Sequence, residues 1–314
     1  MKKAWVIGEG GLLGAHLRAQ LETQPGLQLF TPSAAFSWDN SEIVLQQFQM
    51  AIDAFAKTVA VEDEWQIFWA AGRGTMHSAE QELLEETQIF KHFIHMIVHS
   101  SLNLAKGLFH FASSAGAVYA GSQNSIITEK TLTHPINPYG VAKLEQESFL
   151  KNMVQQNPLL NVLVTRISTL YGNRIKQNDI QGLLAKISRQ VVRNQPIHIY
   201  VPLGTMRDYL HAGDAARTIA STAEYLQGKR GGFYIKLVAS ERACTIAEII
   251  SIFKRAAHRN IRMIHYAIPS SAFYVKNIQY RSINFKNILS LPPRNLLIGI
   301  SQLLENDRYL SKNS

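Results

Sequence analysis

A run of glycines near the N-terminus constrains the fold of this chain more than any other feature. Residues 4–7 are apolar, the string Gly8-Glu9-Gly10-Gly11-Leu12-Leu13-Gly14 follows directly, and leucines then recur at helical spacing as far as Leu21. The glycines allow a tight turn and a close approach of the backbone to a pyrophosphate at the helix N-terminus. A glycine-rich turn without a ligand is the alternative. The order of strand, turn and helix favours a dinucleotide site.

Apolar strands alternate with amphipathic helices through the first half of the chain. The runs interpreted as strands are 4–7, 27–31, 65–70, 108–112 and 162–167. No hairpin signal joins them, so successive strands are expected to lie parallel, with helices crossing between them. The pattern predicts an α/β fold with a Rossmann-type, doubly wound parallel sheet.

Beyond Gly172 the pattern loosens, and shorter elements indicate a smaller C-terminal α/β lobe. The expected helices there are 180–193, 212–226, 246–258 and 296–305, and the expected strands are 197–201 and 233–237. We predict a dinucleotide-binding domain over residues 1–170, to which 207–235 returns, and a substrate-binding lobe over 171–206 and 236–314. No repeat or flexible linker is visible, so the two lobes are expected to pack tightly on each other.

The ends of the predicted strands carry the residues expected to contact a dinucleotide. The second strand ends in Thr31-Pro32-Ser33, with neither an acid for a free ribose 2′-hydroxyl nor a nearby arginine for a 2′-phosphate, so NAD and NADP are not separated. Asp39 could contact the adenine end or cap the helix that begins near Ser41. The third strand runs into Ala70-Ala71-Gly72, small residues over which a cofactor could pass.

A tyrosine and a lysine four residues apart follow the fourth strand. Tyr139 and Lys143 share one face of a helix that Asn137-Pro138 is expected to begin. A nearby positive charge favours the phenolate and suits the tyrosine to proton transfer. The spacing is also common on exposed helices, so the pair alone says little. Its weight comes from Ser113 and Ser114, which end the preceding strand where open α/β sheets bind ligands.

Composition indicates a soluble globular protein. Hydrophobic residues make up 46% of the 314 and charged residues 18%, without a long low-complexity tract. No apolar run approaches the ~20 residues that a membrane helix needs. The apolar segment after Met1-Lys2-Lys3 is too short for a signal peptide, so a cytoplasmic location is expected.

The net charge of +9 is unevenly distributed along the chain. The first 150 residues carry 9 Lys and Arg against 15 Asp and Glu, and the remainder carries 23 against 8. The basic residues of the second part are scattered through apolar segments and form no arginine-rich run. A basic part of this kind could bind nucleic acid, but a phosphate-bearing small substrate fits the distribution at least as well.

Metal and disulfide chemistry find little support in the sequence. Cys244 is the single cysteine, which excludes an internal disulfide and argues against a zinc site of thiolates. His92, His95 and His99 recur at helical spacing, but no carboxylate or cysteine completes a credible ligand set. We interpret them as partly exposed helix histidines and expect no metal.

The glycine turn, the serine strand end and the Tyr139/Lys143 pair, in this order, resemble the extended short-chain dehydrogenase/reductase family of nucleotide-sugar epimerases and dehydratases. Further segments extend the resemblance to about residues 3–305. Arg166-Ile167-Ser168-Thr169-Leu170-Tyr171-Gly172-Asn173-Arg174 is similar to R-x-x-N-x-Y-G-P-R, with Thr169 in place of the asparagine. Arg207-Asp208-Tyr209-Leu210-His211 is similar to R-D-[FY]-[IV]-H, and residues 231–249 to a later segment with T-x-x-E.

This resemblance implies roles for particular residues. Tyr139 would be the acid/base, Lys143 would hold the nicotinamide ribose and promote ionisation of the tyrosine, and Ser114, or else Ser113, would bind the substrate oxygen. The residues implied in cofactor binding are Gly8, Gly10, Gly11, Leu12, Leu13, Gly14, Asp39, Ala70, Ala71, Gly72, Tyr139 and Lys143. The residues implied in substrate binding are Thr169, Arg174, Arg207 and Arg281. Arg207 would meet the substrate's diphosphate; a surface salt bridge is the alternative for Arg207 and Arg281.

The implied activity is hydride transfer between tightly held NAD or NADP and a sugar carbon of a nucleoside-diphosphate sugar. An epimerase is preferred to a dehydratase, because Ala115-Gly116-Ala117 offers neither an acid nor a base beside the serine. The alternatives are a reductase of nucleotide-linked 4-keto sugars and, from another class, a non-catalytic NAD(P)-sensing protein. The expected partner is the nucleotide sugar, with no nucleic acid and no membrane, and a homodimer is a possible assembly.

Overall fold

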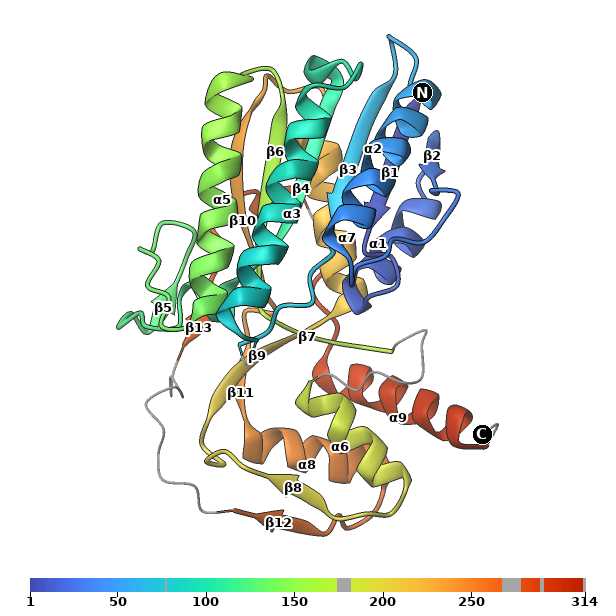
Figure 1. Ribbon diagram of the computed structural model, residues 1–314. Coiled ribbons are helices and arrows are strands. Elements are labelled where there is room, and N and C mark those ends of the chain that lie inside the picture. Colours follow the sequence, from blue (N-terminus) through green and yellow to red (C-terminus); the bar gives the residue numbers. More distant parts are fainter. Residues whose placement is uncertain (77, 174–181, 267–277, 289–290, 313–314) are drawn as a thin grey trace.

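The protein consists of two lobes, a larger one built on a central sheet and a smaller one assembled from segments on both sides of residues 212–238, which belong to the larger lobe (Figure 1). The computed structural model describes residues 1–76, 78–173, 182–266, 278–288 and 291–312. The sheet has six parallel strands in the order β10-β6-β4-β3-β1-β2. Their bounds are β1 Lys2–Ile7, β2 Leu27–Phe30, β3 Glu64–Trp69, β4 Gly107–Ser114, β6 Asn161–Ile167 and β10 Gly232–Val238. The predicted Rossmann-type parallel sheet is confirmed.

On the side of β1 away from β3, the sheet has a single strand, β2, which forms its edge. Helix α2 (Ser41–Thr58) leads from this edge strand directly to β3 on the other side of β1. A dinucleotide-binding sheet of the usual strand order has two strands on that side. The chain segment between the second and third predicted strands is short because this sheet lacks one strand and one helix of the usual order.

Helices cover both faces of the sheet, α2, α3 (Glu80–Val98) and α5 (Pro138–Gln156) on one face and α1 (Leu12–Glu22) and α7 (Ala212–Leu226) on the other (Figure 1). Two separate apolar cores result. The core beneath the first three helices is rich in aromatic side chains, including Trp5, Phe48, Trp69, Phe93 and Phe109. The core beneath α1 and α7 is mostly aliphatic. Burial of the aromatic rings, at ~1.5–3 kcal/mol each, is a large part of what holds α2 and α3 on the sheet.

Helix α5 begins where the sequence predicted. The side chain of Asn137 accepts the N–H of Gly140 at 2.9 Å, and Pro138 occupies the first helical position, where its missing N–H costs nothing. Helix α3, which carries His92 and His95, ends at Val98, and a single 3₁₀ turn, Leu104–Lys106, precedes β4. His92 and His99 each direct Nδ1 to the backbone oxygen four residues earlier.

The smaller lobe packs three helices against short strands. Helices α6 (Leu183–Val192), α8 (Ile246–Ala257) and α9 (Leu296–Lys312) share one apolar core. The strands are β7 Thr169–Tyr171, β9 Met206–His211 and β11 Ala243–Thr245 in one sheet, and β8 Ile197–Ile199 paired with β12 Met263–His265. The remaining elements are α4 Ala115–Val118, β5 Ile126–Ile127 paired with β13 Gln279–Tyr280, and a 3₁₀ turn at Lys286–Ile288. The predicted division into a dinucleotide-binding domain and a substrate lobe stays a proposal, which this packing supports.

Two segments that resemble family motifs, T-x-x-E and R-D-[FY]-[IV]-H, make hydrogen bonds to the backbone of this lobe. Thr245 and Glu248 form a capping box at the start of α8, with the Glu248 side chain accepting the N–H of Thr245 at 2.6 Å. The buried carboxylate of Asp208 accepts the N–H groups of Ser240 and Arg242, at 2.9 and 3.1 Å. Both motifs therefore stabilise the backbone of the smaller lobe.

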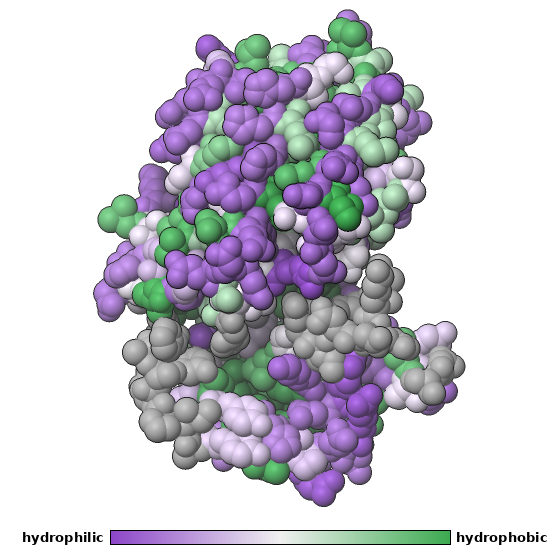
Figure 2. Space-filling view, viewed as in Figure 1, coloured by the Kyte–Doolittle hydropathy of each residue, from purple (hydrophilic) through white to green (hydrophobic). Residues whose placement is uncertain are grey.

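The visible face of the larger lobe is covered mostly by hydrophilic side chains, with green side chains in scattered groups (Figure 2). Over the described residues, no helix combines the length and the apolar character needed to cross a membrane.

Buried His110 makes the stability of the sheet sensitive to acid. Its Nε2 lies 2.8 Å from Thr165 Oγ1, and burial lowers its pKa to about 3. Below pH ~6.5 the imidazole of His110 binds a proton in the unfolded chain, whereas the folded protein keeps it neutral. The free energy of unfolding is therefore highest above that pH and falls as the pH is lowered. We expect His110 to reduce the free energy of unfolding by about 2 kcal/mol between pH 7 and pH 5.

Urea denaturation at the two pH values tests this expectation. His110→Gln, which keeps a partner for Thr165, should show a smaller loss between pH 7 and pH 5 than the wild type. His92→Gln, at an exposed position on α3, is the control and should match the wild type. Equal losses in wild type and His110→Gln would contradict the assignment.

Candidate functional site

The glycine turn joins β1 to α1 at the carboxyl edge of the central sheet. Gly8 has a φ of 89°, and a Cβ at this position would lie 2.6 Å from the backbone nitrogen of Ala71. A Cβ on Gly14 would lie 2.1 Å from the carbonyl oxygen of Gly8. The N-cap residue Gly11 has no side chain to bond the first N–H groups of α1, so these remain for an anion. The turn therefore has the tight packing and the open helix end that a pyrophosphate needs.

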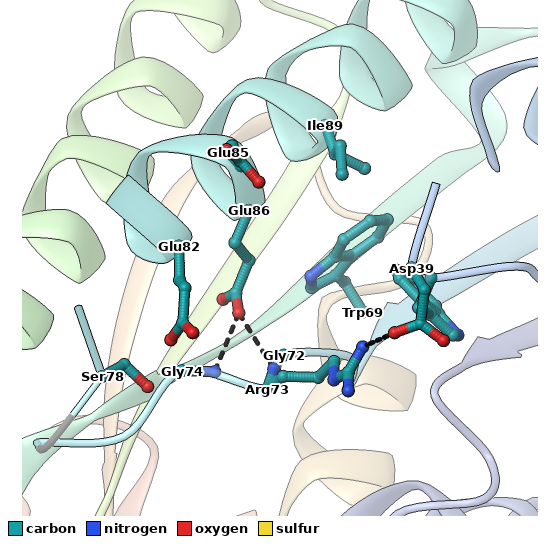
Figure 3. A pocket seen from close by; sticks show the side chains of 11 residues that line it. Asp39, Trp69, Gly72, Arg73, Gly74, Ser78, Glu82, Glu85, Glu86 and Ile89 are labelled. Atoms are coloured by element: carbon teal, nitrogen blue, oxygen red, sulfur yellow. Dashed lines mark hydrogen bonds and ion pairs between the residues drawn. The ribbon is translucent and has the colours of Figure 1, made fainter. Parts of the chain in front are cut away.

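Three pockets that share lining residues extend from this turn along the carboxyl edge. We name each pocket for the role that the sequence predicts for its residues. The ribose pocket has a volume of about 550 Å³ and is lined by Gly8, Gly10, Arg18, Ser33 and Trp38. The adenine pocket, about 480 Å³, is lined by Trp38, Asp39, Trp69, Gly72, Arg73 and Ile89 among others (Figure 3). The catalytic pocket, about 250 Å³, is lined by Leu13, Ala70, Ala71, Gly72, Ser114, Tyr139 and Lys143 among others. A glycine turn followed by these pockets fits an extended dinucleotide.

Asp39 lies at the mouth of the adenine pocket and does not cap α2. Its carboxylate pairs with the guanidinium of Arg73, which Figure 3 shows reaching across from the loop after β3. The side chain of Asn40 caps α2 instead, accepting the N–H of Ile43 at 3.0 Å. Of the two alternatives for Asp39, the helix cap is therefore wrong, because the neighbouring residue occupies that position.

An arginine does lie beside the end of β2, contrary to the expectation from the sequence. Arg18 Nη1 on α1 is 2.5 Å from Glu9 Oε2 and 3.1 Å from Thr31 Oγ1. Its charge is already paired there, since Arg18 Nε also lies 3.1 Å from a carboxylate oxygen of Glu22. This contact was not predicted, because helix α1 brings the arginine across the turn to a strand end 13 residues further along the chain.

Tyr139 and Lys143 line the catalytic pocket together with Ser114. The Lys143 ammonium lies 5.7 Å from the centre of the Tyr139 ring and 5.0 Å from that of Phe111. The lysine side chain is 6% exposed, so its charge acts in surroundings largely shielded from water. The predicted shared helical face is confirmed, and it faces the carboxyl end of β4.

Ser113 faces a different set of partners. Its Oγ donates to Glu147 Oε1 at 2.6 Å, and the Glu147 carboxylate pairs with Arg166, whose Nη2 approaches Oε2 at 2.6 Å. Arg166 Nη1 also donates to the hydroxyl of Tyr119 at 2.6 Å. Both serines line the catalytic pocket, but the hydroxyl of Ser113 is engaged by Glu147, so Ser114 is the serine whose hydroxyl stays available there.

Lys143 has a partner that the sequence did not reveal. Glu86 on α3 places Oε1 3.5 Å from the Lys143 ammonium, and Gln146 Oε1 accepts from it at 3.2 Å. Gln146 in turn donates to Thr87 Oγ1 at 3.1 Å. Glu86 lies far from Lys143 in the sequence, and only the packing of α3 on α5 brings the two together.

The profile of the NAD dependent epimerase/dehydratase family matches residues 4–234, which include the glycine turn and all three pockets. The chain belongs to this family. The resemblance seen in the sequence is therefore confirmed, and NAD or NADP is the cofactor class that it indicates.

Relatives of this epimerase/dehydratase chain include UDP-glucose 4-epimerase of Dictyostelium discoideum, 27% identical over 165 residues, or 48% of this chain and 47% of the relative. A dTDP-4-dehydro-6-deoxyglucose reductase of Escherichia coli is 27% identical over 115 residues, or 37% of this chain and 36% of the relative. The chain thus spans half or less of the length of the curated relatives it matches.

Solved structures share the whole fold at lower identity. The UDP-glucose 4-epimerase of Thermotoga maritima with UDP-glucose has a TM-score of 0.77 and 18% identity, covering 100% of both chains. RMD of Pseudomonas aeruginosa with NADPH has the same TM-score and identity, covering 99% of this chain and 100% of the other. Both establish the architecture of this family member in both lobes.

Three of the four residues implied in substrate binding lie on or directly after short strands outside the six-stranded sheet. Thr169 is exposed at the start of β7, beside Leu170, which lines the catalytic pocket. Arg207 lies on β9, where its Nη1 donates to the carbonyl oxygen of Met206 at 2.9 Å. Arg281 follows β13 with an exposed side chain. Arg174 lies outside the described residues, so its predicted role stays a prediction.

Proposed function

We propose that this chain is an NAD(P)-dependent epimerase of nucleoside-diphosphate sugars. One observation carries the proposal: Ser114, Tyr139 and Lys143 line a single pocket next to a glycine turn that fits a dinucleotide. The cofactor, when bound, supplies the acceptance and return of hydride. The same Tyr139 would remove the proton of a sugar hydroxyl and return it, while Ser114 binds that oxygen.

The other residues of the site position the reactants in this proposal. The open N-terminus of α1 would bind the pyrophosphate, and small Ala70 and Ala71 let the dinucleotide lie close to the strand end. Arg207 and Arg281 would meet the diphosphate of the sugar nucleotide, since guanidinium groups bind phosphate oxygens in pairs. A homodimer in the cytoplasm is part of the proposal.

An epimerase is preferred within the family because α4 begins with Ala115-Gly116-Ala117 and places no acid or base beside Ser114. A reductase of nucleotide-linked 4-keto sugars is the second candidate, favoured by the relative from Escherichia coli. A non-catalytic NAD(P) sensor would have no use for a serine, a tyrosine and a lysine together in one pocket.

Incubation of the purified protein with UDP-glucose and other nucleotide sugars tests the proposal, with products followed by NMR and retained cofactor identified by mass spectrometry. We expect a sugar epimer to form with no net change in reduced cofactor. Stoichiometric consumption of NADH or NADPH with a 4-keto sugar would decide for the reductase. Cofactor binding without turnover of any nucleotide sugar, together with binding of a macromolecule, would favour the sensor.

A further inference from the structure

The ammonium group of Lys143 is held from two sides. The ammonium donates to Oε1 of Gln146 at 3.2 Å and forms an ion pair with Oε1 of Glu86 at 3.5 Å. Gln146 belongs to the same helix, whereas Glu86 belongs to α3. The ring centre of Tyr139 lies 5.7 Å from the ammonium, and both side chains line the catalytic pocket.

The second oxygen of the same carboxylate holds the loop after β3. Glu86 Oε2 accepts the backbone N–H groups of Arg73 and Gly74, both at 2.9 Å, as the dashed lines in Figure 3 show. This loop packs against the proposed acid/base, since a Cβ on Gly74 would lie 3.4 Å from Tyr139 Cδ2. One carboxylate therefore contacts both the loop beneath the cofactor pockets and the lysine of the catalytic pair.

We propose that Glu86 is a positioning residue that orients Lys143 toward the cofactor ribose and Tyr139. A lysine has a flexible four-carbon stem, and ordering it costs up to ~2 kcal/mol of side-chain entropy. Contacts that order Lys143 before the cofactor arrives remove that cost from binding. The inference deepens the proposed function and rests on it.

The other charged side chains near Lys143 and Glu86 are paired with each other or lie at the rim of the adenine pocket. They are Arg73 paired with Asp39, Glu82 and Glu85 on the rim of the adenine pocket, and Glu147 paired with Arg166. Glu86 is the carboxylate among the described ion pairs that reaches Lys143.

Glu86→Gln is expected to keep the hydrogen bonds to the loop after β3 and to remove the ion pair with Lys143. The amide oxygen can still accept from Arg73 and Gly74, which leaves the NH₂ group facing Lys143, where it cannot accept a hydrogen bond. We expect the Kd of the preferred cofactor, NAD or NADP, to rise about tenfold and kcat to fall, with the KM of the sugar nucleotide unchanged. Tryptophan fluorescence can report the Kd, because Trp38 and Trp69 line the adenine pocket.

A double-mutant cycle with Lys143→Met shows whether Glu86 acts through the lysine. Glu86→Gln should have no further effect on cofactor Kd in the Lys143→Met background. Glu145→Gln is the matched control, because the Glu145–Lys91 pair also joins α5 to α3, at 2.6 Å, but lies outside the pockets. This control should leave Kd and kcat as in the wild type.

Two results would overturn the inference: a cofactor Kd for Glu86→Gln equal to that of the wild type, or a tenfold loss that persists in the Lys143→Met background. The second result would mean that Glu86 acts through the loop alone. The cycle measures cofactor binding, so it still decides the role of Glu86 if the protein binds cofactor and turns over no nucleotide sugar, the outcome that would refute the proposed function.

Discussion

Replacement of Tyr139 by phenylalanine is expected to lower kcat by a hundredfold or more while cofactor Kd changes little. The phenol provides the proton-transferring group of the proposed mechanism, and general acid/base catalysis contributes about 10²–10⁴ to rate. The ring itself packs beside Lys143 and the loop at Gly74, and phenylalanine keeps those contacts. Steady-state kinetics for kcat and fluorescence titration for Kd measure the two quantities separately.

Two comparisons sharpen this experiment. Tyr225→Phe, at an exposed position on α7, should behave as the wild type. Ser114→Ala should lower kcat, whereas Ser113→Ala should act mainly on stability, because its hydroxyl donates to buried Glu147. A Tyr139→Phe variant that retains kcat within tenfold of the wild type would exclude the phenol as the acid/base.

Replacement of Arg166 by methionine is expected to lower the free energy of unfolding by about 3–5 kcal/mol. The side chains of Arg166 and Glu147 are 7% and 5% exposed, and the guanidinium approaches both oxygens of the carboxylate. Removal of the guanidinium leaves a buried carboxylate whose remaining partner is the hydroxyl of Ser113. Urea denaturation followed by circular dichroism measures the loss.

The double variant Arg166→Met/Glu147→Leu separates the loss of the pair from the cost of an unpaired charge. Apolar replacement of a whole buried pair is often neutral, so stability should recover in large part, less about 1–2 kcal/mol for the lost partners of Ser113 and Tyr119. A single Arg166→Met variant within 1 kcal/mol of the wild type would show that water reaches Glu147 and replaces the arginine.

Local patterns in the sequence predicted much of the fold. Residues 212–226, expected as a helix from apolar spacing, form α7 with the same bounds, and Asn137-Pro138 begins α5 as expected. The helix near 296–305 is extended to Lys312 in α9. Spacing and capping act within one or two turns, so such features are readable without knowledge of distant residues.

Contacts between distant segments were not readable in this way. Asp39 pairs with Arg73, and Arg18 reaches Thr31, although neither pair has a spacing that predicts contact. The choice between Ser113 and Ser114 likewise depends on Glu147, which helix α5 places on one face of β4.

The sequence by itself determined the glycine turn, the parallel sheet and the Tyr139/Lys143 face, because each depends on the conformational preferences and periodicity of neighbouring residues. Only the tertiary structure decided what surrounds that pair. Packing of α3 on α5 puts Glu86 beside Lys143, and α5 also places Glu147 where it accepts the hydroxyl of Ser113 and not that of Ser114. The electrostatic field and hydrogen bonds at the pair come from residues remote in sequence, because these interactions depend on distance in space.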